Sequence, residues 1–170
     1  MALIIEDGSI VANANSWASR ADYIAYALAR GVVIPDTDAA DVQLVKAAEF
    51  IGSHEANLKG YLVQRDQSLA FPRHDIVIDD WYWSSTEIPR QVTLCQMALA
   101  MDINAGVDLY NKPVNPNLAV KSERVEGAVS VEYAVSDTVG QKLSRSSTSD
   151  ALLASLLQRN GLVGLRMVRT

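Results

Sequence analysis

The sequence predicts a mainly α fold, a four-helix bundle-like domain that carries one β-hairpin arm and an extended C-terminal tail. Three observations lead to this prediction. Apolar residues recur at helical spacing in four separate stretches, which is the pattern of amphipathic helices. Residues 119–135 alternate between apolar and polar side chains around a Glu-Gly turn, which is typical of a hairpin. The last ten residues follow an Asn-Gly helix stop, so the domain is expected over residues 1–160 and the tail over residues 161–170.

The first two helices are expected near the N-terminus. Ser19 is a suitable N-cap for a helix over residues 20–30. Gly31 is expected to end that helix, because glycine readily takes the left-handed conformation at a helix end. A second helix is expected from Asp38, as its cap, to about residue 55.

Residues 57–86 show weak periodicity and are expected to form a long loop. Loops of that length are uncommon and often functional. A structural motif inside the loop is expected to anchor it, and its members are Gln67, Leu69, Phe71, Pro72 and Arg73. Phe71 should bury its ring and Pro72 should fix the exit of the loop. Arg73 should pair with a carboxylate or with backbone carbonyls.

The third helix is the most strongly patterned element. Glu87 and Pro89 mark its first turn, where the N–H that proline lacks has no helical partner. Residues 92–103 are apolar on nearly every side, and Gly106 ends the helix. A helix that is apolar all round is expected in the middle of a fold. Asp102 is the exception, since a buried carboxylate there would need an arginine or a backbone partner.

The last regular elements are the hairpin and a fourth helix. Val129, Val131 and Tyr133 fall on one face of the second hairpin strand, because side chains alternate along a strand. Thr148 or Ser149 is expected to cap the fourth helix.

The charge distribution limits the partners that the chain can bind. Net charge is −5 and the isoelectric point is about 4.9, which argues against broad binding to phosphate backbones. Residues 142–170 contain five Lys and Arg against one Asp, a net +4, so residues 1–141 carry −9. A basic segment after an acidic body indicates a localised partner contact.

Residues suited to chemistry are few. The single cysteine, Cys95, lies in a predicted helix, and the two histidines, His54 and His74, have no metal-ligand spacing. No glycine-rich phosphate loop is present. We therefore expect no enzyme activity, no metal and no cofactor. No apolar run is long enough to span a membrane, and the N-terminus lacks the basic region of a signal peptide.

Residues 59–83 leave a nucleic-acid reading open. This segment mixes Lys, Arg and His with five aromatic residues, and single-strand binders use aromatic platforms in basic grooves. Four aspartates in the same segment outnumber its Lys and Arg. Packing of the loop is therefore favoured over stacking on bases.

Several blocks of residues resemble a tailed-phage protein family. They are residues 2–8 followed by 14–16, the Gln67-x-Leu69-Ala70-Phe71-Pro72-Arg73 motif, Glu87-Ile88-Pro89, and residues 120–123. The family is often labelled DnaT-like single-stranded DNA-binding protein. It is similar in gene context and fold to phage head–tail connectors, also called adaptor or head-completion proteins. The resemblance extends to about residue 157, and a tryptophan is common in the family where this chain has Phe71.

The resemblance implies a structural virion protein at the head–tail interface, assembled in the host bacterial cytoplasm. Its partners would be copies of itself in a twelve-fold ring, the portal protein, and the next tail-side connector or stopper protein. The genome DNA would pass through the ring without sequence-specific binding, and no membrane would be involved. The alternative is a DnaT-like single-stranded DNA-binding protein, and a third possibility is a small regulatory or immunity-type interaction protein.

Contacts between subunits and with the portal are expected from the hairpin arm and the tail, because exposed strand edges and apolar residues beside cations favour docking. The residues expected to make them are Val129, Val131, Tyr133, Leu162, Leu165, Arg166, Met167 and Arg169.

Overall fold

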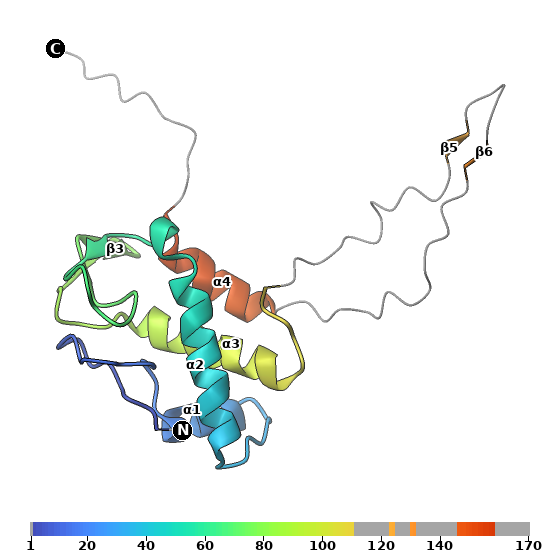
Figure 1. The fold of residues 1–170 in the computed structure, drawn as a ribbon, viewed down its shortest axis with the longest axis horizontal. Coiled ribbons are helices and arrows are strands. Elements are labelled where there is room, and N and C mark those ends of the chain that lie inside the picture. The colour runs from blue at the N-terminus through green and yellow to red at the C-terminus, as the bar shows by residue number, and fades with distance from the viewer. Residues whose placement is uncertain (1, 111–122, 125–129, 132–145, 159–170) are drawn as a thin grey trace.

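The computed structural model describes residues 2–110, 123–124, 130–131 and 146–158. These residues form four α-helices and three two-stranded antiparallel sheets (Figure 1). The helices are α1 (Arg20–Leu28), α2 (Asp38–Gly52), α3 (Arg90–Asn104) and α4 (Ser147–Leu156), and a 3-10 turn, η1 (Glu55–Asn57), follows α2. The strands are β1 (Tyr61–Leu62), β2 (Arg73–His74), β3 (Ile76–Ile78), β4 (Trp81–Trp83), β5 (Glu123–Arg124) and β6 (Ser130–Val131).

The prediction of a mainly α, four-helix bundle-like fold is wrong, because the fold is mixed α/β. Residues 57–86, expected as a loop, contribute two hairpins, β1 with β2 and β3 with β4. Each strand is two or three residues long, which is too short for an alternating pattern to stand out. The structure therefore has the four expected helices but packs them with small sheets.

The β3–β4 hairpin is closed by an unusual two-residue turn. Ile78 pairs with Trp81, so Asp79 and Asp80 form the loop, with φ angles of 53° and 65°. Two successive left-handed residues define the type I′ turn that suits a twisted hairpin. Aspartate tolerates this conformation better than most residues, although Asn-Gly or Asp-Gly is the usual signal.

The core is centred on α3, which packs against α1, α2 and α4 (Figure 1). Its fully buried side chains include Val92, Cys95 and Leu99. This central position agrees with the all-round apolar pattern of the helix. Pro89 is the N-cap of α3 rather than a residue of its first turn.

Local capping fixes the ends of α1, whereas the N-cap residue of α2 makes no side-chain capping bond. The Ser19 hydroxyl caps α1, and Gly31, at φ 77°, lets the Val32 N–H reach back to the Ala27 carbonyl. For α2 the N-cap is Thr37, not Asp38. The helix ends at Gly52, a few residues before the expected end, and the chain then tightens into η1.

The start and end of α4 are set by contacts with other elements. Its N-cap is Ser146, rather than Thr148 or Ser149. It ends at Leu156, because Leu157 takes an extended backbone and bridges to Leu58. This bridge is antiparallel and joins the end of α4 to the start of the hairpin region.

A buried carboxamide joins the N-terminal segment to the core. Gln96 of α3 accepts hydrogen bonds at Oε1 from the backbone N–H groups of Trp17 and Ala18, both at 3.0 Å. Its Nε2 donates to Ser16 Oγ at 2.8 Å and to the Leu44 carbonyl of α2 at 3.0 Å. All four hydrogen-bonding positions of the side chain are therefore used.

Among the described residues, no helix is long and apolar enough to cross a membrane.

Candidate functional site

The loop motif forms an internal scaffold under the first hairpin. Arg73 is 5% exposed and donates to three backbone carbonyls, those of Lys59 and Gly60 at 2.9 Å and of Ala70 at 3.3 Å. Burial lowers the pKa of its guanidinium. The positive charge of Arg73 is thus directed at carbonyl oxygens inside the protein, where an outside ligand does not reach it.

Gln67 and Phe71 complete this scaffold. Gln67 accepts from the N–H groups of Val63 and Gln64 and donates to the carbonyls of Leu69 and Pro72. These four hydrogen bonds hold the two sides of the loop together.

The ring of Phe71 is 1% exposed and lies edge-on to the ring of Trp17, with centroids 6.1 Å apart. Trp17 Nε1 also donates to the Phe71 carbonyl at 3.2 Å. The burial of Phe71 agrees with its sequence-based expectation. The peptide between Phe71 and Pro72 is cis.

Three aromatic rings project into solvent from the two hairpins that this scaffold supports. Tyr61 is 65% exposed, Trp81 75% and Tyr82 84%. Ile76 and Ile78 of β3 are buried and fix the hairpin to the core. The Tyr61 ring also lies beside the His74 ring of the partner strand, with centroids 5.5 Å apart. We call the exposed rings of Tyr61, Trp81 and Tyr82 together the aromatic surface. Trp81 and Tyr82 are successive residues of β4, so their rings lie on opposite faces of the hairpin.

The charges near the aromatic surface are mainly negative. Asp79 and Asp80 form the turn between β3 and β4, directly before Trp81, and Asp75 accepts from His74 Nδ1 at 2.8 Å. In residues 59–83, the Lys and Arg side chains that are not buried are those of Lys59 and Arg65. The arrangement offers flat rings for stacking but no cationic groove for a phosphate backbone.

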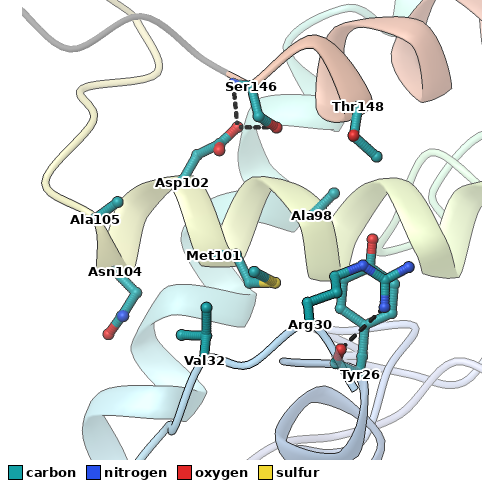
Figure 2. Close-up of a pocket in the computed structure, with 10 residues that line it drawn as sticks. All are labelled: Tyr26, Arg30, Val32, Ala98, Met101, Asp102, Asn104, Ala105, Ser146 and Thr148. Atoms are coloured by element: carbon teal, nitrogen blue, oxygen red, sulfur yellow. Dashed lines mark hydrogen bonds between the residues drawn. The ribbon is translucent and has the colours of Figure 1, made fainter. Parts of the chain in front are cut away.

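A pocket lies away from the hairpins, between the C-terminal ends of α1 and α3 and the start of α4 (Figure 2). Its volume is about 260 Å³. The lining residues are Tyr26, Arg30, Val32, Ala98, Met101, Asp102, Asn104, Ala105, Ser146 and Thr148.

Two charged side chains of the pocket differ in how they are used. The Arg30 guanidinium carbon lies 3.4 Å from the centroid of the Tyr26 ring, and Nη1 donates to the Tyr26 carbonyl at 2.9 Å. Asp102 accepts from the Ser146 N–H at 3.1 Å and from the Ser149 hydroxyl. The buried carboxylate of Asp102 therefore has a backbone partner, one of the two kinds expected, while the Arg30 charge stays at the pocket rim.

The residues expected to contact neighbouring subunits or the portal are mostly outside the described residues. This holds for Val129, Tyr133, Leu162, Leu165, Arg166, Met167 and Arg169. Val131 lies in β6, opposite Glu123 of β5.

No sequence pattern predicted the pocket, because its lining comes from three helices and their flanking residues, which are far apart in the chain. The sequence did group Trp81 and Tyr82 with other aromatic residues. Placing them on a hairpin would have required recognising Ile76–Ile78 as a strand that is followed by a turn of two aspartates.

Within the described part of the chain, no group of three or more His, Cys, Asp or Glu side chains could hold a metal ion. His54 Nδ1 lies 2.9 Å from the Phe50 carbonyl, and Cys95 is buried.

Solvent-facing aromatic rings on a hairpin that is anchored in the core are a feature of binding surfaces. A family described as "Putative DnaT-like ssDNA binding protein" matches residues 1–170, the whole chain, and the chain belongs to this family. The DnaT-like part of the resemblance is therefore confirmed, and it extends beyond residue 157. Nothing in the comparisons supports the head–tail connector part, and neither curated proteins nor solved structures give a match.

Proposed function

We propose that this protein binds single-stranded DNA by stacking bases on Trp81 and Tyr82, and that it catalyses no reaction. The observation that carries the proposal is the exposure of both rings on a hairpin anchored by Ile76 and Ile78. Soluble proteins rarely leave neighbouring large aromatic rings in water without a partner. The family to which the chain belongs supports a single strand as that partner.

The charges around these rings determine the strength and salt dependence of binding. Stacking contributes about 1–3 kcal/mol per base, but association itself costs several kcal/mol. With few phosphate contacts, the dissociation constant should be about 10⁻⁴ M or weaker. Each phosphate contact on a single strand adds about 0.7 to the slope of log affinity against log salt. A slope below about 1.4, the value for two contacts, is expected.

Fluorescence anisotropy with a labelled oligo(dT) at several salt concentrations tests the proposal. The variant Trp81→Ala/Tyr82→Ala should weaken binding at least about tenfold, since two stacking contacts are lost. Tyr110→Ala is the matched control, because Tyr110 is 64% exposed but lies outside the hairpins. Equal affinity of the double variant and the wild type would refute the stacking site. An absence of any binding would refute the function.

A second candidate function is the structural virion protein of the head–tail interface. It is supported by the net charge of −5, which disfavours retention of DNA. The Gln67–Arg73 motif supports it indirectly, because the motif resembles a tailed-phage family that is similar in gene context and fold to connectors. In this role copies of the chain would form a ring beneath the portal protein, present a platform to the tail-side stopper, and let the genome pass.

Electron microscopy of purified portal protein mixed with this chain would test the second candidate. A ring of added density on the portal supports the connector role. A portal that stays bare at high protein concentration contradicts it, whatever the result with oligo(dT).

A further inference from the structure

We propose that the pocket between α1, α3 and α4 takes one unstacked nucleobase, with its phosphate at Arg30. This inference rests on the proposed binding of single-stranded DNA and adds a second contact for the strand. The pocket is distinct from the aromatic surface, because its lining comes from the three helices and the residues next to their ends, and from none of the four strands β1–β4.

The size and lining of the pocket suit a flat, mostly apolar ring. Its volume of about 260 Å³ is slightly below the ~300 Å³ at which pockets for drug-sized ligands begin. Val32, Ala98 and Met101 form its apolar wall (Figure 2). A ring system as large as one nucleobase could enter, but a folded peptide segment could not.

The rim of the pocket suits an anion. The guanidinium of Arg30 carries five N–H donors, and the structure shows one of its nitrogens in a hydrogen bond, to the Tyr26 carbonyl. Within the described residues, Arg30 takes part in no ion pair. Figure 2 shows its planar group stacked over the Tyr26 ring at the pocket. A guanidinium held flat in this way is ready for bidentate contact with a phosphate.

One carboxylate in the pocket lining already has hydrogen-bond partners within the protein. Asp102 also lines the pocket, but its carboxylate accepts hydrogen bonds from Ser146 and Ser149 at the start of α4. Thr148, which is exposed at the same helix start, adds a hydroxyl that can donate to or accept from a base edge. The apolar wall would contact the face of the base, the Thr148 hydroxyl would contact its edge, and the Arg30 guanidinium would contact the phosphate.

Two variants separate the base contact from the phosphate contact. Ala105→Trp fills the pocket from the exposed end of α3 without changing charge, and Ala39→Trp, at an exposed alanine of α2, is its control. Arg30→Gln removes the cation, and Lys46→Gln removes an equal charge from the exposed side of α2. Circular dichroism of each variant shows whether the fold is kept.

The probes are thymidine, thymidine monophosphate and oligo(dT). Their binding is monitored through the ¹³C-methyl NMR signal of Met101. Thymidine monophosphate should shift this signal and bind at least about fivefold more tightly than thymidine, since a charge-assisted contact is worth over 1 kcal/mol. Arg30→Gln should abolish that preference, and Ala105→Trp should weaken both ligands. The two controls should behave as wild type.

The inference is overturned if Met101 does not respond to about 10 mM thymidine monophosphate, where even a millimolar site would be filled. It is also overturned if Arg30→Gln and Ala105→Trp bind oligo(dT) as wild type does while the Trp81/Tyr82 variant is impaired, and in that case the proposed function stands. If none of these variants changes oligo(dT) binding, both proposals fail.

Discussion

Replacing Gln96 by leucine tests how the N-terminal segment is held to the helical core. Leucine has a similar volume and keeps the helix, but it removes all four hydrogen bonds that Gln96 makes with Ser16, Trp17, Ala18 and Leu44. Every one of these bonds is buried. The loss therefore leaves polar groups without water to replace the lost partner.

The size of the stability loss follows from the hydrogen bonds that each polar group keeps in the Gln96→Leu variant. The N–H of Trp17 has no other acceptor in the described residues, so stranding it costs about 1–3 kcal/mol. The N–H of Ala18 still reaches Ser16 Oγ at 3.2 Å, and the Leu44 carbonyl lies within α2, so each of these losses is about 0.5–1.5 kcal/mol. The added apolar burial of leucine offsets about 1 kcal/mol. These contributions sum to a net loss of about 1–5 kcal/mol, and we expect a value in the middle of that range, about 2–4 kcal/mol.

Urea unfolding followed by tryptophan fluorescence measures this loss, and thermal unfolding should show a melting temperature lower by roughly 5–15 °C. Gln91→Leu is the matched control on the same helix. Within the described residues, Oε1 of Gln91 is buried without a hydrogen-bond partner, and Nε2 makes one long bond of 3.3 Å to Asp79. That variant should be neutral or slightly stabilised. A Gln96→Leu protein within about 0.5 kcal/mol of wild type would show that the reasoning is wrong.

Three further substitutions test the scaffold by urea unfolding. Phe71→Ala should destabilise the protein by about 3–5 kcal/mol, because it empties a buried ring site; an unchanged midpoint would mean that the ring is exposed. Ser149→Ala should lower the free energy of unfolding by about 1.5–3 kcal/mol, since buried Asp102 loses a hydroxyl donor. Ser155→Ala, which removes a hydroxyl bonded within α4, is the control and should have a smaller effect. Gly60→Ala should cost at least about 1 kcal/mol, because the backbone has φ 71° and a Cβ would lie 2.4 Å from the His74 carbonyl oxygen; Gly52→Ala, with open space around it, should be tolerated.

Patterns that act within a few residues predicted much of the helical part. The Ser19 cap and the Gly31 stop of α1 are confirmed, as is the central position of α3. The predicted cap of α4 is wrong, because Ser146 is fixed by its contact with Asp102, 44 residues earlier. A contact over that distance leaves no mark in the local sequence.

Sequence patterns could not predict the hairpins or the candidate sites. β1 and β2 pair across ten intervening residues because Arg73 binds the carbonyls of Lys59 and Gly60, and no periodicity reports such a bond. The turn at Asp79 and Asp80 uses left-handed backbone without glycine, so the usual hairpin signal is missing.

Local sequence patterns were sufficient to predict the four helices, the acidic character of the body and the family to which the chain belongs, because periodicity, charge and motif are properties of residues near one another in the chain. Only the tertiary structure decided that Trp81 and Tyr82 face solvent while Phe71 is buried, and that Arg30 meets Met101 and Thr148 at one pocket. These outcomes depend on which distant surfaces pack together, and packing between distant segments is set by the whole core rather than by any one stretch of sequence.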